Sequence, residues 1–537
     1  MNRFDVAILG GGFAGSILAR CLAAEGARVL LVEKALHPRF ALGESTTPLA
    51  NFALERLAGR YGFSDLHSLA AWGRWQQALP ELRHGRKRGF SFYGHQVGEP
   101  FHSGSRNERR ALFAASPNDF VADTHWLRAD VDHHLILAAA EAGVDIRQGA
   151  EVVDLEIGRG IDLAWVENGS RHKAAAGRVV DATGAASLVS RRLGLDGADP
   201  LPFRTSLVAA HVQGLADFLP EPPPAPYPEE QAAVHHLLDG GWLYVLPFDG
   251  PSTHQAVVSI GLVMRSERMK AHGSADAEST LRSFLSRFPT LDAQFRDALP
   301  VSPWQVRENL AYRRTASSAD RWLLLPGAYC FLDPLFSTGI AWSLLGVERA
   351  RDVLCGHASP ARYSRQLSQE ADQMTRLIES AWRALGSTSS PAERFDDFVA
   401  VGLCYFGAVS WAESLGRLGD GPDEMGSATS WHGFLGAGDA VLERAYEDLS
   451  RRLRDSEPRR AGELRRSVVE QLRSRDVAGL DQPAVPNVFP LDLELLVRRA
   501  HRMGLEPDVV RARLDRLRGQ LGGSAADPSS ESSGSDT

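Results

Sequence analysis

The chain has 537 residues, enough for two to four domains, and 44% hydrophobic with 23% charged residues is typical of a globular protein with a sizeable core. A formal net charge of −8 excludes the strongly basic footprint of a nucleic-acid-binding protein, so we expect no nucleic-acid partner. The 4 cysteines are widely spaced without CxxC pairing, which favours reduced thiols over a disulfide framework or a zinc site. We therefore expect no metal.

The sequence also indicates where the protein resides. It enters a strand-like run at once, which leaves no room for the charged and apolar regions of a signal peptide. The longest uncharged stretch, 398–412, falls short of the roughly 20 residues that span a bilayer. We expect this stretch to be a buried helix, and the protein to be cytoplasmic with no membrane partner.

The N-terminal residues alternate between apolar runs and a helical pattern. Apolar runs at 5–9 and 28–32 flank a helical pattern at 14–25, which predicts a βαβ unit at the start of a parallel sheet. A strand-rich block at 145–181 and an apolar run at 322–325 predict two later returns of the chain to the same sheet.

A glycine motif directly follows the first predicted strand. Its G-x-G-x-x-G spacing provides a tight turn, close approach of the backbone to a pyrophosphate and close packing of the following helix. Glu33 ends the second strand, where a carboxylate accepts hydrogen bonds from an adenosine ribose. The motif in this context predicts a dinucleotide site formed by Gly10, Gly12, Phe13, Ala14, Gly15 and Glu33.

Two later segments favour a flavin over a nicotinamide dinucleotide. The run 181–184 follows a strand and has the pattern that flavoprotein hydroxylases place against the dinucleotide. The segment 333–340 contains a turn that opens a helix, whose first N–H groups would face the flavin pyrimidine or an anion. We therefore expect FAD to contact Ala182, Gly184, Asp333, Gly339 and Ile340.

The sequence thus predicts an α/β fold with a Rossmann-like FAD-binding domain of the GR2 type, an inserted antiparallel β-sheet substrate domain and a helical C-terminal region. The strand-like segments of the insert are 207–212, 242–247 and 256–263, and the pattern from about 341 onward is helical. The expected divisions are 1–200 and 301–355 for the FAD-binding domain, 201–300 for the substrate-side sheet, 356–520 for the helical region and 521–537 for a disordered tail.

Several segments together resemble the flavin-dependent halogenases, the tryptophan halogenase-like family within the FAD-dependent monooxygenase superfamily. The resemblance covers about residues 1 to 355, and its matching segments are the glycine loop, 37–40 with 43–48, 87–92, 128–132 and 333–340. It adds Arg39, Ser45, Thr46 and Arg128 to the expected FAD contacts.

The resemblance also implies a mechanism. In that family, reduced FAD (FADH2), oxygen and a halide yield hypohalous acid, which passes through an interior tunnel to a lysine beside the substrate. Lys87 matches this lysine, and the aromatic residues at 90–93 would desolvate it; the alternative is an exposed lysine at a strand start. Thr338 and Gly339 match the turn that resembles a halide site. Chloride or bromide would then be a co-substrate.

Four positions depart from the family pattern. The Trp-x-Trp-x-Ile-Pro signature, thought to hinder ordinary monooxygenation, is altered at Tyr244 and Leu246, which keeps an FAD-dependent hydroxylase of an aromatic or carrier-bound substrate as the alternative. Ala328 replaces an aspartate that often contacts the ribityl chain. Phe336 replaces the glutamate of tryptophan halogenases, which points to the branch that acts on small phenol or pyrrole substrates.

The remaining expectations concern partners. No second glycine-rich βαβ motif follows, so we expect reduced flavin to come from a separate NAD(P)H-dependent flavin reductase. The long helical region leaves open a substrate tethered to a carrier protein. It also leaves open a third hypothesis, a flavin-binding maturation protein that docks a macromolecular substrate.

Overall fold

The computed structural model describes residues 2–197, 201–219, 224–249, 256–271, 276–387, 389–419, 433–455, 460, 462–481 and 483–521. The disordered tail expected at the C-terminus lies, beyond residue 521, outside the described residues.

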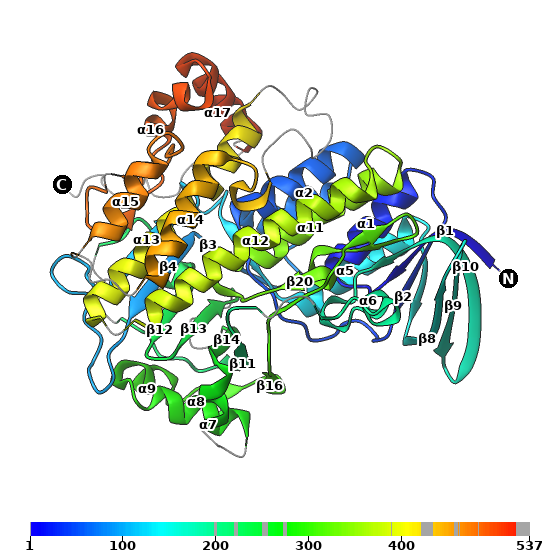
Figure 1. Cartoon of the computed structure of the whole chain (residues 1–537), viewed down its shortest axis with the longest axis horizontal. Helices are drawn as coiled ribbons and strands as arrows, with labels where there is room; N and C mark the ends of the chain where they lie inside the picture. The colour runs from blue at the N-terminus through cyan, green and yellow to red at the C-terminus, as the bar shows by residue number, and fades with distance from the viewer. Residues whose placement is uncertain are drawn as a thin grey trace, which may run out of the picture.

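The chain begins with the expected βαβ unit (Figure 1). Strands β1 (Asn2–Leu9) and β2 (Val29–Glu33) pair in parallel and are joined by α1 (Phe13–Ala24). The last four residues of β1 and all of β2 are buried, which is typical of parallel strands covered on both faces. The long strand β10 (Ser170–Asp181) pairs with β1 on its other side, also in parallel.

Within the described residues this first sheet has eight strands in the order β18-β19-β10-β1-β2-β7, with β9 on β10 and β8 on β9. The predicted returns at 145–181 and 322–325 are therefore confirmed. The helix α1 packs against α5 and α11. The further elements are β7 (Asp145–Gln148), β8 (Ala150–Ile157), β9 (Ile161–Glu167), β18 (Ser318–Ala319), β19 (Trp322–Leu324), α5 (Arg128–Glu141), α6 (Leu188–Leu193), α10 (Pro326–Tyr329) and α11 (Thr338–Leu354).

A second sheet, with nine strands among the described residues, runs in the order β15-β11-β14-β13-β12-β4-β5-β21, with β16 on β11. The strands expected at 207–212, 242–247 and 256–263 are β11, β13 and β14, and they pair antiparallel as predicted. The bounds are β4 (Gly89–Gly94), β5 (Arg110–Ala114), β11 (Thr205–Gln213), β12 (Ala233–Leu238), β13 (Gly241–Pro247), β14 (Val258–Arg265), β15 (Leu299–Pro300), β16 (Gln305–Arg307) and β21 (Val488–Phe489), with α7 (Ser266–Ala271), α8 (Ala277–Leu285) and α9 (Pro289–Phe295) beside them.

The second sheet does not follow the expected division of the chain. Strands β4 and β5 lie within 1–200 and β21 lies within 356–520, yet all three belong to the substrate-side sheet. Pairing between strands far apart in sequence leaves no local signal, so neither boundary separates the two sheets. The division into domains stays a prediction. The correction is that the substrate-side sheet also contains β4, β5 and β21 from outside residues 201–300.

The helical region begins with α12 (Pro360–Leu385) and α13 (Pro391–Leu418). A capping box formed by Ser390 and Glu393 opens α13. By length and composition α13 could cross a membrane, but 72% of its most apolar window is buried inside the protein, as for the core helix expected at 398–412. The later helices are α14 (Ala440–Arg454), α15 (Glu463–Leu472), α16 (Leu493–Arg498) and α17 (Pro507–Leu521).

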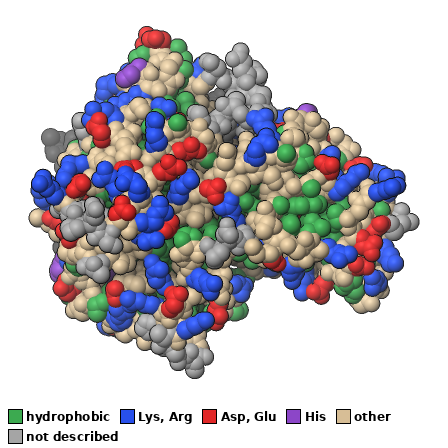
Figure 2. Space-filling model, viewed as in Figure 1, with side chains coloured by type: hydrophobic (Ala, Val, Ile, Leu, Met, Phe, Trp, Pro, Cys, Tyr) green, Lys and Arg blue, Asp and Glu red, His purple; other side chains and the backbone are tan. Residues whose placement is uncertain are grey.

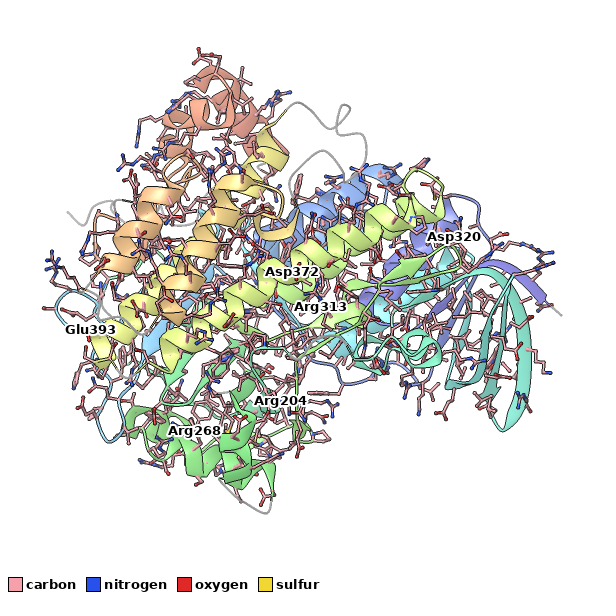
Figure 3. The ribbon with its side chains drawn as sticks, in the orientation of Figure 1. Arg204, Arg268, Arg313, Asp320, Asp372 and Glu393 are labelled. Atoms are coloured by element: carbon pink, nitrogen blue, oxygen red, sulfur yellow. The ribbon has the colours of Figure 1, made fainter. Side chains whose placement is uncertain are left out.

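The helical region is joined to the rest of the molecule by charged contacts. Figure 3 shows Arg313, on β17 (Tyr312–Arg313), close to Asp372 on α12, and the two side chains form an ion pair of 2.5 Å.

On the face shown in Figure 2, basic and acidic side chains are interspersed. The described part of the chain also has two small sheets, β17 with β20 (Cys330–Phe331) and β3 (His84–Lys87) with β6 (Asp123–Trp126).

Candidate active site

The glycine loop between β1 and α1 has no room for side chains at two positions. A Cβ on Gly10 would lie 2.6 Å from the carbonyl oxygen of Ala182, and Gly10 has a φ of +104°. A Cβ on Gly15 would lie 2.1 Å from the carbonyl oxygen of Gly10. The first and third glycines of the motif are therefore required by the packing of β1, β10 and α1.

Two guanidinium groups face the N-terminus of α1, whose N-cap residue, Gly12, has no side chain to cap it. A Cβ on Gly12 would lie 3.5 Å from Nη2 of Arg39 and 3.7 Å from Nη2 of Arg128. Asp132 holds Arg128 through two hydrogen bonds of 2.8 Å. Asp132 also accepts a hydrogen bond of 3.2 Å from the N–H of Phe13, the first residue of α1. A helix N-terminus flanked by guanidinium groups still fits the pyrophosphate of a dinucleotide.

The carboxylate of Glu33 is fixed beside this loop. It accepts hydrogen bonds from the backbone N–H groups of Gly11 at 2.7 Å and Ala35 at 2.8 Å. The buried hydroxyl group of Ser45 has no hydrogen-bond partner within the part of the chain that the structure describes, which is a position a bound molecule would satisfy. The glycine loop, Arg39, Arg128, Glu33 and Ser45 therefore fit FAD, with Glu33 at the adenosine ribose and α1 at the pyrophosphate.

The turn before α11 is the second half of this site. Phe336 and Ser337 have φ values of +66° and +53°, which residues other than glycine rarely adopt. Thr338 is half-buried and Gly339 exposed at the start of α11, and no side chain caps this helix. The first N–H groups of α11 are thus available to an anion or to the flavin ring.

Asp333 stabilises this turn from inside the protein. Its two oxygens accept hydrogen bonds from the N–H of Leu335 at 3.0 Å and from the indole of Trp382 at 3.1 Å. Burial raises the pKa of Asp333 to about 7. The structure thus gives Asp333 a role in holding the turn, and its direct contact with FAD stays a prediction, as does that of Ile340.

Lys87, the last residue of β3, is completely buried, so the alternative of an exposed lysine is wrong. Its Nζ donates a hydrogen bond of 2.5 Å to the carbonyl of Thr46 and lies 3.8 Å from the centre of the Phe90 ring. Burial lowers the pKa of Lys87 to about 7, against the opposing effect of the Asp123 carboxylate. The amine is therefore close to the balance between its neutral and charged forms at physiological pH.

A cavity of about 1370 Å³ adjoins Lys87. The residues lining it include Asn51, Phe90, Asp123, Tyr405 and Glu413, from α2 (Pro48–Tyr61), β4, β6 and α13. Lys87 does not line the cavity and lies directly behind Phe90, which does. The amine thus lies between the carbonyl of Thr46 and the ring of Phe90.

Three tryptophans differ in their relation to the cavity. Trp72, the first residue of α4 (Trp72–Ala78), lines the cavity. So do Ala70 and Ala71, which follow α3 (Ser64–Leu69). Trp75 and Trp126 are fully buried, with ring centres 6.4 Å apart, and belong to the core. Cys330 is buried, and burial raises the pKa of its thiol to about 12, so it is a packing residue.

The 43–48 segment is anchored to the second sheet by a buried carboxylate. Glu44 accepts hydrogen bonds from Nε2 of His211 at 2.7 Å and from the hydroxyl of Ser259 at 2.6 Å. Thr46 is fixed in turn to Thr124 by a backbone hydrogen bond of 2.9 Å. These bonds hold the carbonyl to which Lys87 donates.

Three residues of the site gave no signal in the sequence. Asp123 pairs with Lys87 across β3 and β6, and Glu413 and Tyr405 come from α13, more than 300 positions after Lys87 in the numbering. Tyr405 donates a hydrogen bond of 2.7 Å to the carbonyl of Phe336, which joins the cavity wall to the turn before α11. Only the tertiary fold brings these groups together.

The fold and the glycine-loop site define an FAD-binding oxidoreductase. Residues 5–308 match the family model of FAD dependent oxidoreductases, and the chain belongs to this family. Its relatives include tetracycline 7-halogenase of Kitasatospora aureofaciens, 30% identical over 370 residues that cover 65% of this chain and 64% of that one. Monodechloroaminopyrrolnitrin halogenase PrnC of Pseudomonas fluorescens is 30% identical over 345 residues, covering 63% and 59% of the two chains.

The chain therefore spans 59–64% of the length of these two relatives, which confirm its resemblance to flavin-dependent halogenases. Solved structures extend the likeness in fold. The halogenase PltM has a TM-score of 0.78 at 23% identity, covering 90% of this chain and 98% of its own, and the flavin-dependent halogenase CmlS has a TM-score of 0.57 at 20% identity, covering 79% and 74%. The predicted fold class is confirmed.

Proposed function

We propose that the protein is an FAD-dependent halogenase that uses reduced flavin, oxygen and chloride or bromide to halogenate an aromatic substrate. The observation that carries this proposal is the placement of Lys87, buried between the flavin-side segment at Thr46 and the cavity wall at Phe90. When bound and reduced, FAD supplies the electrons with which oxygen is activated to oxidise the halide. Relatives of this chain are named as halogenases, which supports the proposal.

Residues of the chain would bind the halide, bind the hypohalous acid and exclude water. The N–H groups of Thr338 and Gly339, at the uncapped start of α11, would bind the halide. Lys87 in its neutral form would hold the hypohalous acid by hydrogen bonding, since an amine pKa lowered to about 7 leaves a free electron pair on much of the population. The ring of Phe90 would keep water from this amine.

A hydroxylase is the second candidate, and a specific observation favours it. In β13 the family signature carries Tyr244 and Leu246 in place of tryptophan and isoleucine, and both side chains are buried. A hydroxylase would use the same FAD site and cavity, transferring oxygen to the substrate and needing no halide.

The proposal extends to partners and location. A separate flavin reductase would supply the reduced flavin, and the protein would act in the cytoplasm. Some relatives are named for carrier-bound substrates. One is the 1H-pyrrole-2-carbonyl-[peptidyl-carrier protein] brominase of Pseudoalteromonas luteoviolacea, 26% identical, and it supports a substrate tethered to a carrier protein as an alternative to a free one. Because α13 and residues near α16 and α17 line the cavity, we assign the helical region to enclosing the substrate instead of docking a macromolecule.

Replacement of Lys87 tests the proposal. Lys87→Met keeps the length of the side chain and removes the amine, so halogenated product should fall at least a hundredfold while FAD content and halide-dependent oxidation of reduced flavin persist. Lys34→Met, at an exposed lysine that directly follows β2 and pairs with Glu151, is the control. Undiminished halogenation by Lys87→Met would refute the assigned role, and oxygenated product from both proteins would favour the hydroxylase.

A further inference from the structure

Asp123 is a carboxylate of the site to which neither the sequence nor the proposed halogenation assigns a role. It opens β6 and pairs with Lys87 across β3, and its side chain is almost completely buried. Both Asp123 and Asn51 line the cavity. The cavity therefore has a carboxyl group and an amide on the same wall as Phe90, behind which the Lys87 amine lies.

The hydrogen bonding of this wall is incomplete. Oδ1 of Asp123 accepts a hydrogen bond of 2.7 Å from Nδ2 of Asn51. Oδ2 of Asp123 and Oδ1 of Asn51 have no hydrogen-bond partner among the residues that the structure describes. Two buried acceptors left without donors are costly, by about 1–3 kcal/mol each, and a ligand that donates a proton here would recover this. The Lys87 amine does not fill the role: its Nζ donates to Thr46, and Oδ2 of Asp123 has no donor among the described residues.

The charges around Asp123 come from two other elements. Lys87 faces it from β3, and Glu413 and Arg417 from α13. Burial raises the pKa of Asp123 to about 7, Lys87 lowers it and Glu413 raises it. Arg417 also lowers the pKa of Asp123, but its hydrogen bonds of 2.8 Å and 2.5 Å are to Glu413 and Glu55. The carboxyl group is thus a stronger proton acceptor than an ordinary aspartate.

We propose that Asp123 is the general base of this site and takes the proton of a hydroxyl group on the aromatic ring of the substrate. The inference rests on the proposed halogenation and names its substrate class as phenols. A phenol hydroxyl, with an ordinary pKa of about 10, can pass its proton to a carboxylate whose own pKa is raised. A pyrrole N–H is a far weaker acid and would gain little. The cavity also exceeds the roughly 300–1,000 Å³ of most ligand pockets, which suits a substrate larger than one ring.

The step balances as follows. Asp123 accepts the hydroxyl proton, and the resulting phenolate carbon forms a bond to the halogen as the oxygen–halogen bond of hypohalous acid breaks. The hydroxide released takes the ring C–H proton and leaves as water, which restores aromaticity. Asp123 then returns its proton to the oxygen, so that phenol and hypohalous acid give halophenol and water.

The test compares resorcinol with its dimethyl ether, 1,3-dimethoxybenzene, which is electron-rich but has no hydroxyl proton. With the holoenzyme, reductase and bromide, both rates should fall below about pH 7 as Lys87 becomes protonated, and the resorcinol rate should fall more steeply because Asp123 also becomes protonated. Titration of Lys87 would affect both substrates alike. In Asp123→Asn the resorcinol rate should drop about 10²–10⁴-fold and fall with pH no more steeply than the ether rate, with FAD content unchanged. Asp65→Asn, at a carboxylate already paired with Arg20 at 2.7 Å outside the cavity, is the control.

Equilibrium binding of resorcinol to the FAD-loaded enzyme separates this inference from the proposed function. Asp123→Asn should weaken binding of resorcinol at least fivefold and leave the ether unaffected. If the product gains oxygen instead of bromine but resorcinol affinity still depends on Asp123, halogenation is refuted and the role of Asp123 as the base stands. If resorcinol and ether have the same pH profile in the wild type, or if Asp123→Asn binds and converts resorcinol like the wild type, the inference is overturned. The comparison of pH profiles needs no variant.

Discussion

The hydroxyl group of Tyr405 on α13 donates a hydrogen bond of 2.7 Å to the backbone carbonyl of Phe336, in the turn that precedes α11. The two rings also stack, with centres 4.8 Å apart. Through this contact the helical region fixes a backbone conformation that Phe336, at a φ of +66°, would rarely adopt alone. The C-terminal region thus bears directly on the proposed halide site.

Replacing Tyr405 by phenylalanine should therefore disturb halide binding. The buried Phe336 carbonyl would lose its donor, at a cost of roughly 1–3 kcal/mol in the free energy of unfolding. The turn would relax, and the KM for bromide should rise several-fold. Tyr446→Phe is a matched control, because the hydroxyl of Tyr446 also donates to a backbone carbonyl, that of Cys404 at 3.2 Å, and not to the turn. An equal bromide KM in both variants would contradict the link.

Gly15→Ala should impair FAD binding. The new Cβ would lie 2.1 Å from the Gly10 carbonyl oxygen, a backbone atom that can move only if α1 shifts away from β1. We expect the affinity for FAD, measured by quenching of flavin fluorescence, to fall at least tenfold, or about 1.4 kcal/mol. Gly158→Ala, whose Cβ would meet nothing within 4 Å, should bind FAD as the wild type does. Normal FAD affinity in Gly15→Ala would show that the loop adapts.

Burial of Lys87 predicts how stability depends on pH. Its pKa is lowered from 10.5 to about 7 in the folded protein, so between these values the unfolded chain binds more protons than the folded one. This group therefore makes the free energy of unfolding rise with pH between about 7 and 10.5. Urea unfolding across this range should show a smaller rise for Lys87→Met than for the wild type. Parallel curves would mean that the amine stays protonated in the fold.

Arg417 should matter more for stability than an exposed arginine. Its contacts with Glu55 and Glu413 join α13 to α2 beside the cavity, and its loss would leave both carboxylates without this partner. We expect Arg417→Met to lower the free energy of unfolding by roughly 1–3 kcal/mol. Arg511→Met, which breaks the exposed pair with Glu494, should cost less than about 1 kcal/mol. Equal losses in the two variants would argue against the role of Arg417 at the wall.

The sequence predicts the parts of this protein that depend on local pattern. The glycine loop, Glu33 and the strands of the first sheet follow from spacing and apolar runs, and the structure places them as expected. Lys87 was found by resemblance, and its burial depends on β4 and β6, which local pattern does not pair with it. Asp123 could not be found, because an aspartate in a short strand gives no signal until its cross-strand partner is known.

The most direct test of the account is mass spectrometry of the products formed by the purified protein with FAD, a flavin reductase, NADH, oxygen and a panel of phenols, with and without bromide. The account predicts products with the isotope doublet of bromine, formed only when enzyme and bromide are both present and lost in Lys87→Met. Products that gain one oxygen whether or not bromide is added would contradict it and establish a hydroxylase.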